Sequence, residues 1–589
     1  VWLPVFIIVK LSSFVFFGSY RSIWRYTSLW DMLNIVKAAF TASVIILFGF
    51  GIVEGFAGFP RSVFLLDLLL TVILVGSTRI SIRLYYSHIY LRPGTSNNVI
   101  KKKILLIGAG RTGEKIAREI TNSTDSQYEI LGFIDDDPTR RGARLHGYKV
   151  LGTIKDMTQL SLDYDEIVIT APSATGNQMR RIVKQCKKTG KRYKTVPSFT
   201  EMLNRDISIN SIRDVSYNDL LGREEVKLDM NSIDTLLKGK RILVTGAGGS
   251  IGSELVRQCM NFNPAMLILL DNSEFNLFSI EQELRRNKSS LAMRYILGDI
   301  KDENWIMKVF SDYQPQVVLH AAAYKHVPIQ EAFPREAVLT NVKGTMNLIN
   351  ISHENKVEKF VLVSTDKAVH PVNVMGATKR LAEMMVQCNI KGSKTTYMAV
   401  RFGNVLGSSG SVIPIFQKQI ENGGPVRITH PDMIRYFMSI PEAAQLILQA
   451  GAIGEGSEIF VLDMGKPINI KDMAYDLIRL SGLEPEEDIP VIFTGVRPGE
   501  KLYEELITSG EQIIKTNHKK IVVLKNDSNR QSWFELSMDI EKLILTTQSF
   551  DSDSIKHRLH HIIPEYEPQD ILTPDKTKLQ DWDSKSFEA

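Results

Sequence analysis

Apolar residues dominate the first ninety positions, and the pattern then changes to short buried strands alternating with amphipathic helices. The early apolar stretches cover approximately residues 1–20, 38–53 and 62–77. Each is close to the roughly 20 residues that cross a bilayer as a helix. We therefore expect residues 1–90 to form transmembrane helices. Because the chain starts with Val1 inside apolar sequence, a missing first helix would make four spans. Hairpins lying in the membrane interface are the alternative.

Charge around these stretches predicts their orientation. The loop at residues 21–37 carries basic residues and interleaved aromatics, as cytoplasmic loops do. The connection at residues 54–60 is short and nearly uncharged, so we expect it outside. Further basic residues between 79 and 103 follow the third stretch. This pattern indicates a multi-pass membrane protein whose later domains are cytoplasmic.

A first α/β pattern follows the membrane region. Buried strands are expected near residues 102–107, 131–135 and 166–170. Between the first two, Gly108, Gly110 and Gly113 have the G-x-G-x-x-G spacing of dinucleotide-binding turns. We predict a Rossmann-like domain at 100–204, and its glycine motif is equally compatible with a nucleotide site and with a structural role.

The segment at 205–238 mixes polar and apolar residues with little periodicity, and we interpret it as a connector that packs on both domains. The residues after about 566 are charged and lack an apolar period, which predicts a disordered tail at 567–589.

A second and stronger nucleotide pattern begins at residue 239. Gly246, Gly249 and Gly252 form a glycine turn, with Ser250 and Ile251 among its expected cofactor contacts. A helix is expected to follow from Ser253 to about Cys259. The helix amides and dipole suit a pyrophosphate.

Acidic and small residues follow at the ends of the next strands. Asp271 ends a strand where a carboxylate accepts from the adenosine ribose, which favours NAD over NADP. Asp299 and Ile300 can face the adenine, and Ala321 and Ala322 let the backbone pass close to the cofactor.

Net charge and the positions of the cysteines limit the kinds of partner and site that we expect. The formal net charge is only +5, and no long basic block is present, so we expect no nucleic-acid partner. Cysteines Cys186, Cys259 and Cys388 are scattered, which predicts neither a metal site nor a disulfide framework.

A polar triplet ends the next expected strand. Thr365, Asp366 and Lys367 follow the apolar run at 360–363, and a helix carrying Met375 and Lys379 comes next. The carboxyl end of a parallel strand is where sheet-based sites form, so we expect the triplet in an active site.

The whole chain resembles the membrane-anchored nucleotide-sugar 4,6-dehydratases of the CapD-like polysaccharide biosynthesis family, within the extended short-chain dehydrogenase superfamily. The motifs that carry this resemblance include residues 245–252, 320–328, 364–367, 401–414, 430–437 and 497–503. The short-chain dehydrogenase tyrosine, four residues before the lysine, is Met375 here, as in the long membrane-bound subgroup.

The resemblance implies a fold, a cofactor and a reaction. The fold class is α/β, with N-terminal transmembrane helices followed by two Rossmann-like doubly wound domains, the second an extended short-chain dehydrogenase fold at 239–566. The cofactor is NAD. The reaction converts UDP-N-acetylglucosamine to its 4-keto-6-deoxy product at the bacterial inner membrane, for surface polysaccharide or glycoprotein glycan synthesis.

Within that reaction, each catalytic side chain has an expected role. Asp366 is the acid for the departing C6 hydroxyl, provided that its site raises its pKa. Lys367 is the base at C5 and needs a lowered pKa. Thr365 relays the C4 hydroxyl proton, and Lys379 holds the nicotinamide ribose. Met375 shares a helix face with Lys379 and forms an apolar wall.

A further set of residues is expected to bind the UDP-sugar. Arg435 and Arg497 clamp the diphosphate as bidentate donors, and Glu500 accepts from the uridine ribose. The other expected substrate contacts are Lys325, His326, Met375, Asn404 and Ser408.

Two alternatives remain open. A UDP-sugar 4-epimerase needs redox chemistry only at C4, so the acid and base of the triplet at 365–367 would not be needed. A non-catalytic, NAD-holding membrane scaffold would explain the missing tyrosine and the extra domain. We expect membrane lipid and a UDP-N-acetylhexosamine as partners. Homo-oligomers and contacts with downstream sugar-modifying enzymes are compatible with the sequence.

Overall fold

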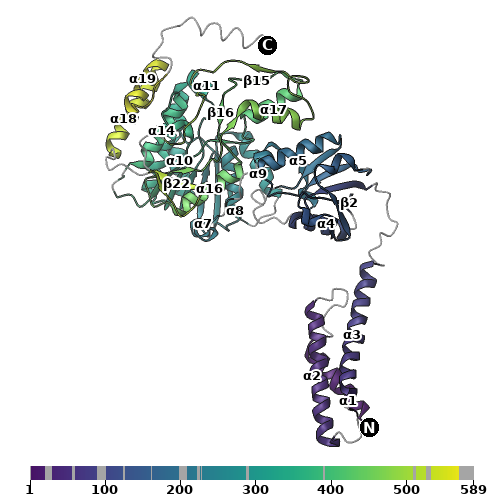
Figure 1. Cartoon of the computed structure of the whole chain (residues 1–589). Helices are drawn as coiled ribbons and strands as arrows, with labels where there is room; N and C mark the ends of the chain where they lie inside the picture. The colour runs from purple at the N-terminus through teal and green to yellow at the C-terminus, as the bar shows by residue number, and fades with distance from the viewer. Residues whose placement is uncertain are drawn as a thin grey trace. The chain divides into compact units, whose positions relative to one another are not determined.

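The computed structural model describes most of the chain as two compact units, the first holding the N-terminal helices and the second both large sheets (Figure 1). The described residues are 2–19, 29–55, 60, 62–88, 101–123, 126–160, 162–197, 209–221, 226, 228–286, 291–388, 390, 392–507, 513–524 and 532–568.

The first unit contains three helices, α1 (Leu3–Phe16), α2 (Leu29–Glu54) and α3 (Ser62–His88). Within α2 and α3, the stretches Asp31–Glu54 and Ser62–Ile82 are long and apolar enough to cross a membrane, by length and composition. These two helices indicate membrane anchoring. The predicted span in the first stretch stays a prediction, and its described helix is α1. The 14 residues of α1 rise only about 21 Å, against a hydrocarbon core of about 30 Å.

Two charged residues meet inside this helical unit. Lys10 of α1 donates from Nζ to Asp67 Oδ1 of α3 at 2.5 Å, and to Thr71 Oγ1 at 2.8 Å. Pairing opposite charges reduces the cost of holding them among apolar helices. The loops at 20–28 and 56–59, on which the predicted orientation depends, lie outside the described residues, as do residues 89–100.

The second unit begins with a seven-stranded sheet in the order β3-β4-β2-β1-β5-β6-β7. Its inner strands are parallel, whereas β3 and β7 pair antiparallel at the edges. The strands are β1 (Lys102–Ile107), β2 (Tyr128–Ile134), β3 (Arg144–Leu145), β4 (Tyr148–Gly152), β5 (Glu166–Ile169), β6 (Arg192–Thr195) and β7 (Arg213–Asp214). The helices of this part are α4 (Arg111–Asn122), α5 (Gly176–Lys188) and α6 (Tyr217–Leu221).

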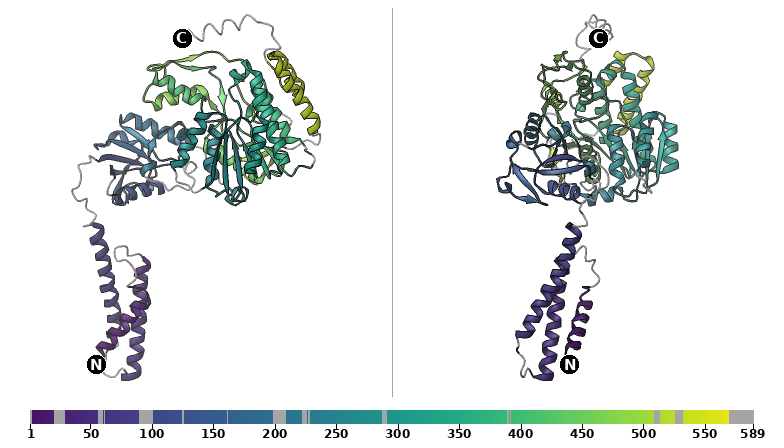
Figure 2. Two further views of the ribbon diagram at one scale, coloured as in Figure 1. Left: turned by 180° about the vertical axis from the view of Figure 1, so that it is seen from behind. Right: turned by 90° about the vertical axis from the view of Figure 1, so that its right-hand side faces the viewer.

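A nine-stranded sheet forms the larger part of this unit, in the order β10-β9-β8-β11-β12-β13-β18-β22-β21 (Figures 1 and 2). The first seven strands are parallel, and β22 and β21 add antiparallel strands. The strands are β8 (Arg241–Thr245), β9 (Met266–Asp271), β10 (Met293–Leu297), β11 (Val317–His320), β12 (Lys359–Val363), β13 (Thr396–Arg401), β18 (Glu458–Leu462), β21 (Ile513–Lys515) and β22 (Ile521–Leu524).

Helices pack on both faces of this sheet because strand residues alternate between two hydrophobic clusters. Leu243 of β8 belongs to one cluster, and its neighbours Ile242 and Val244 belong to the other. The helices are α7 (Met230–Leu237), α8 (Ser250–Met260), α9 (Glu274–Arg286), α10 (Glu303–Tyr313), α11 (Val327–Ala332), α12 (Pro334–Ala337), α13 (Gly344–Glu354), α14 (Val374–Gln387), α16 (Ile440–Ile453), α18 (Trp533–Thr546) and α19 (Ser552–Ile562). A π-helical turn at Val338–Lys343 joins α12 to α13.

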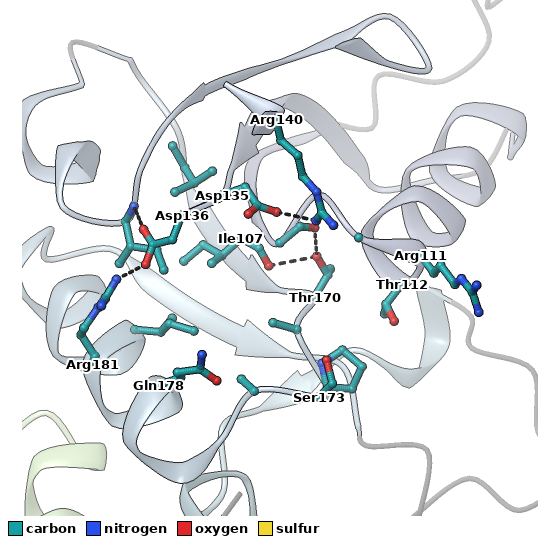
Figure 3. Close-up of a pocket in the computed structure, with 18 residues that line it drawn as sticks. Ile107, Arg111, Thr112, Asp135, Asp136, Arg140, Thr170, Ser173, Gln178 and Arg181 are labelled. Carbon is teal, nitrogen blue, oxygen red and sulfur yellow. Dashed lines mark hydrogen bonds and ion pairs between the residues drawn. The ribbon is translucent and has the colours of Figure 1, made fainter. Parts of the chain in front are cut away.

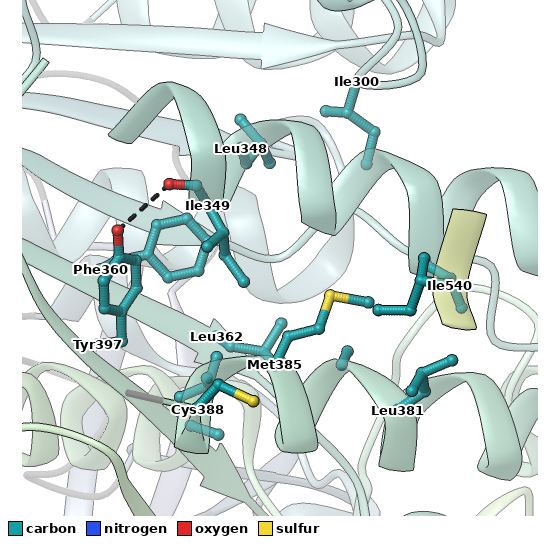
Figure 4. Close-up of a cluster of buried hydrophobic side chains, with 14 of the residues drawn as sticks. Ile300, Leu348, Ile349, Phe360, Leu362, Leu381, Met385, Cys388, Tyr397 and Ile540 are labelled. Carbon is teal, nitrogen blue, oxygen red and sulfur yellow. Dashed lines mark hydrogen bonds between the residues drawn. The ribbon is translucent and has the colours of Figure 1, made fainter. Parts of the chain in front are cut away.

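The cluster under α13 and α14 brings distant segments together (Figure 4). Tyr397 donates its hydroxyl to the Ile349 carbonyl at 3.2 Å, and Ile540 of α18 is fully buried in the same cluster. The C-terminal helices are therefore part of this domain's core. Of the predicted tail at 567–589, residues 569–589 lie outside the described residues.

Short elements cap the carboxyl edge of the nine-stranded sheet. Three two-stranded pairs join β14 to β17, β15 to β20 and β16 to β19. Their bounds, with two further helices, are β14 (Asn404–Val405), α15 (Val412–Glu421), β15 (Val426–Ile428), β16 (Ile434–Arg435), β17 (Phe437–Met438), β19 (Ile468–Asn469), α17 (Ile470–Leu480) and β20 (Val491–Phe493).

Strand order reverses between β8 and β11, since the chain runs outward from β8 to β10 and then returns to β11 on the other side. Ligands of doubly wound sheets bind at such a switch point, outside the carboxyl ends of the strands. The predicted glycine turn and the polar triplet follow β8 and β12, so the topology brings them to the same edge.

Candidate active site

The glycine turn after β8 has the geometry of a dinucleotide cradle. Gly246 has φ +66°, and a Cβ there would lie 2.8 Å from the Ala322 backbone. A Cβ on Gly252 would lie 2.0 Å from the Gly246 carbonyl oxygen. Only glycine fits either place. Gly249 is the N-cap of α8 without a side-chain cap, so the first amides of that helix are left for an anion.

The acid at the end of β9 closes this cradle. Asp271 is buried, and its Oδ2 accepts from the Gly248 amide at 2.8 Å. Its Oδ1 accepts from the Ser273 amide at 2.9 Å. The carboxylate makes no ion pair with any described residue, which fits a partner for ribose hydroxyl groups.

The remaining predicted cofactor residues line neighbouring strand ends. Ala321 and Ala322 follow β11 and pack against Gly246. Asp299 accepts from the Lys301 amide at 2.9 Å, and Ile300 is buried beside it. The residues present thus fit a dinucleotide such as NAD.

The triplet after β12 forms a connected polar group. Thr365 donates from Oγ1 to Asp366 Oδ1 at 2.9 Å, and Lys367 Nζ lies 3.0 Å from the same oxygen. Lys367 also donates to Asn404 Oδ1 at 3.3 Å. Asp366 is 1% exposed, and its Oδ2 has no hydrogen-bond partner among the described residues. A buried carboxylate oxygen without a partner costs free energy, which suits a group that meets a ligand.

The structure adds a residue that sequence reasoning missed. Glu504 is buried, and its Oε1 lies 3.8 Å from Lys367 Nζ. Burial raises the pKa of Glu504, although the positive charges of Lys367 and Arg435 oppose the rise. A carboxyl group with a raised pKa beside the triplet is a second candidate acid. The available signal was its position directly after the motif at 497–503.

The pKa of Lys367 is raised and not lowered as predicted, and Glu504 contributes to this difference. Burial lowers the pKa of this lysine, but the charges of Asp366 and Glu504 raise it by more, so it lies above its ordinary value. Lys367 is therefore held as an ammonium in this arrangement, and a substrate must change its surroundings before it can act as a base.

Lys379 has the lowered pKa instead. It is buried in α14 and donates from Nζ to the Val363 carbonyl at 2.6 Å. Burial lowers its pKa to about 8, with Glu383 opposing the change. Met375, one helical turn earlier, is 3% exposed.

Arg435 is arranged differently from the predicted diphosphate clamp. Its Nη1 donates to the carbonyls of Ile434 at 2.8 Å and Leu502 at 2.9 Å, and its Nη2 donates to Lys501 O at 2.5 Å. Nη2 also lies 3.8 Å from Glu504. The buried guanidinium thus holds the segment that carries Glu504 against β16.

The other residues that were predicted to bind the substrate differ in how far they are buried. Ser408 is buried in the loop after β14, and the next amide, of Ser409, donates to Ser250 Oγ at 3.1 Å. This bond ties the predicted substrate loop to the cofactor turn. Arg497 is exposed, and its amide donates to Glu500 at 3.3 Å.

Lys325 and His326 directly precede α11, with His326 as its N-cap, and both residues are partly exposed to solvent. A Cβ on Gly410 would lie 2.7 Å from the His326 ring, so this ring packs on the loop that carries Ser408. Burial lowers the pKa of both residues, and for His326 the Lys325 charge adds to the effect.

Two buried polar groups support the strand ends. His320 contacts Thr245 Oγ1 at 2.8 Å and Thr345 Oγ1 at 2.9 Å, and burial lowers its pKa to about 3. Glu383 of α14 binds Arg401 of β13 at 2.7 Å, both fully buried. Among the described residues, no group of three or more His, Cys, Asp or Glu side chains could hold a metal ion.

Comparison with known proteins places this arrangement in a family. The sequence model described as polysaccharide biosynthesis protein matches residues 242–526, and one described as CoA-binding domain matches 15–197. UDP-N-acetylglucosamine 4,6-dehydratase (inverting) of Campylobacter jejuni is 35% identical over 281 residues, covering 47% of this chain and 80% of that protein. Other relatives are named as UDP-glucose 4-epimerases.

Two relatives match over nearly the full length. Probable polysaccharide biosynthesis protein EpsC of Bacillus subtilis is 42% identical over 503 residues, covering 84% of this chain and 82% of EpsC. Capsular polysaccharide biosynthesis protein CapD of Staphylococcus aureus is 41% identical over 546 residues, covering 91% of this chain and 90% of CapD. With a membrane-type helical unit, two Rossmann-like sheets and this match, the chain belongs to the CapD-like family of polysaccharide biosynthesis proteins.

Proposed function

We propose that this protein is a membrane-anchored, NAD-dependent UDP-N-acetylglucosamine 4,6-dehydratase that releases a UDP-4-keto-6-deoxy-N-acetylhexosamine. The observation that carries the proposal is the cluster of Asp366, Lys367 and Glu504 beside the cofactor turn. Two carboxyl groups, each within 4 Å of the same amine, supply the acid and base that elimination of water needs and that C4 redox alone does not.

A bound NAD would supply the redox chemistry, as acceptor of the C4 hydride and donor of that hydride to C6. Asp271 and the turn from Gly246 to Gly252 would hold its adenosine and pyrophosphate, and Lys379 would hold the nicotinamide ribose. With the pKa of Lys379 lowered to about 8, the lysine is still largely charged at neutral pH and stabilises a neighbouring oxyanion.

The proton steps fall to the triplet and Glu504. Thr365 connects the C4 hydroxyl to Asp366 Oδ1 through its 2.9 Å hydrogen bond. Lys367 removes the C5 proton once its amine is neutral. Asp366 or Glu504 protonates the C6 oxygen as it leaves as water, and the raised pKa of Glu504 keeps a proton available for this step.

The substrate assignment extends what is known of relatives. The Campylobacter relative is named as a UDP-N-acetylglucosamine 4,6-dehydratase, and it matches 47% of this chain. Exposed Arg497 and the loop of Ser408 are suited to the diphosphate of such a substrate. Two long apolar helices support a membrane-bound enzyme.

Mass spectrometry of the reaction with detergent-solubilised full-length protein tests this proposal. We expect the product of UDP-N-acetylglucosamine to have lost one water. A product of unchanged mass with inverted C4 would identify an epimerase. Bound NAD without turnover of UDP-N-acetylglucosamine would contradict the proposed reaction and favour the scaffold.

A further inference from the structure

Glu504 lies on a segment without regular secondary structure. Residues 501–506 belong to no helix or strand, and backbone carbonyl groups in such segments need other partners. The Ile434 amide supplies one of these, since it donates to the Leu502 carbonyl at 3.2 Å. Glu504 Oε1 lies 3.8 Å from Lys367 Nζ. The place of this carboxyl group therefore also depends on the side chains that bind its backbone.

Two buried arginines bind this backbone on either side of Glu504. Arg435 donates to the carbonyls of residues 501–502, before the acid, at 2.5 and 2.9 Å. Arg401 donates from Nη1 to the Leu506 carbonyl, after the acid, at 3.1 Å. Each arginine fixes one side of Glu504, and Arg401 ties that segment to the end of β13.

The rest of the Arg401 guanidinium is bound to Glu383 of α14. Its Nε donates to Glu383 Oε1 at 3.1 Å, and its Nη2 donates to Oε2 at 2.7 Å. This is the bidentate geometry that arginine offers to a carboxylate. Glu383 Oε1 also accepts from Ser364 Oγ at 2.7 Å, directly before the triplet at 365–367. One ion pair thus connects the segment of Glu504, the triplet and the helix that carries Lys379.

The pair of Arg401 and Glu383 is closed to ligands, because both side chains are 0% exposed. Arg140 of the first sheet shows the opposite arrangement. It pairs with Asp135 at the wall of a cavity (Figure 3), and its side chain is 42% exposed. An arginine at such a wall can bind a ligand directly. An effect of Arg401 on turnover must instead pass through the groups that it holds.

We propose that Arg401 is a positioning residue of the active site, and that it acts by holding Glu504 beside the triplet. Glu383 orients the guanidinium, and the third donor of the fork reaches the Leu506 carbonyl. The inference rests on the proposed dehydratase reaction, in which Glu504 takes part in the proton steps.

A double-mutant cycle on the solubilised full-length protein tests this assignment. Loss of water from UDP-N-acetylglucosamine is measured for the wild type, Arg401→Lys, Glu504→Gln and the protein with both changes. Lysine keeps the positive charge beside Glu383 but lacks the fork that reaches Leu506 at the same time. We expect Arg401→Lys to lower kcat by about ten- to a hundredfold, the size of effect that a small displacement of a reacting group has. KM should stay unchanged, because Arg401 does not touch the substrate.

The background of Glu504→Gln separates positioning from a general structural defect. In this background Arg401→Lys should have little further effect on kcat, because the group that Arg401 positions is already missing. Arg257→Lys is the matched control and should turn over as wild type. Arg257 of α8 binds Glu283 in the same bidentate way, with bonds of 2.7 and 2.9 Å, and belongs to no part of the proposed site.

A second variant covers the case in which Arg401→Lys does not fold. Glu383→Gln combined with Arg401→Met removes both buried charges, so that neither is left unpaired. Glutamine keeps an acceptor for Ser364. Because Glu383 also opposes the lowered pKa of Lys379, turnover is expressed per bound NAD. It should fall as in Arg401→Lys, and a value equal to that of the wild type would overturn the positioning role.

The other outcomes are equally decisive. Wild-type turnover of Arg401→Lys, or an equal loss with and without Glu504→Gln, would overturn the assignment, since independent defects add. Either result, with water lost by the wild type, would leave the proposed reaction in place. No loss of water by the wild type would overturn the proposed reaction and this inference with it.

Discussion

Replacing Asp366 by Asn removes a charge and a proton donor while keeping the side-chain shape. The amide Oδ1 can still accept from Thr365 and Lys367, so the fold and the bound NAD should be retained. Loss of a positioned acid lowers turnover by about 10²–10⁴-fold. We expect an effect in this range for Asp366→Asn.

The same substitution should lower the pKa of Lys367. Two charges 3.0 Å apart interact with about 5.5 kcal/mol at an effective dielectric constant of about 20. Even a third of this value is more than one pKa unit. Because a lysine base acts in its neutral form, activity rises with pH through its pKa. The rising limb of the residual activity should therefore move to lower pH in the variant.

The assay is the rate of water loss from UDP-N-acetylglucosamine from pH 6 to about pH 11.5, a range that extends beyond the ordinary lysine pKa of about 10.4. NAD content is measured in the same samples. Asp463→Asn is a matched control, since this exposed acid follows β18, two strands away from β12 in the same sheet. Near-normal turnover of Asp366→Asn would refute its role as acid. A variant with low turnover but an unmoved limb would show that Lys367 is not the base.

Four further substitutions test other parts of the site. Glu504→Gln should lower turnover with NAD retained, since it removes a carboxyl group 3.8 Å from Lys367; wild-type turnover would exclude Glu504 as an acid. Lys379→Met should reduce NAD content and turnover yet raise the melting temperature below pH 8. The folded-state pKa of Lys379, about 8, lies below the unfolded value, so below pH 8 the charged lysine lowers the free energy of unfolding by about 3 kcal/mol. An unchanged NAD content in the variant would contradict the role of Lys379 in cofactor binding. Asp271→Ala should weaken the preference for NAD over NADP, and an unchanged ratio of affinities would assign selection to another residue. The pKa of His320 is lowered to about 3, so on acidification the unfolded chain is protonated at this residue before the folded protein is. The free energy of unfolding therefore falls as the pH drops from about 6.5 towards 3, by up to about 1.4 kcal/mol per pH unit. His320→Gln should reduce the accompanying decline in melting temperature, and a decline equal to that of the wild type would contradict the burial argument.

Local pattern predicted the parts of the site that are built from consecutive residues. The turn from Gly246 to Gly252 and the acid Asp271 follow from spacing, because the end of each strand determines which residues reach that edge of the sheet. The triplet at 365–367 was predicted for the same reason, since the carboxyl end of a parallel strand is recognisable from its apolar run.

Interactions between distant segments could not be predicted in this way. The pKa of Lys367 depends on Glu504, which reaches it only through the packing of the loop after β20 on the sheet edge. Arg435 was assigned to the substrate because arginines bind diphosphates, but the carbonyls of Lys501 and Leu502 take its donors.

Hydride transfer within one substrate molecule is the central claim, and UDP-N-acetylglucosamine labelled with deuterium at C4 tests it most directly. The full-length protein is incubated with this substrate without added NAD, and the product is analysed by NMR. The account predicts deuterium in the C6 methyl group of a product that has lost water. Deuterium that stays on C4 in an epimerised sugar, or that is lost from the product, would contradict it.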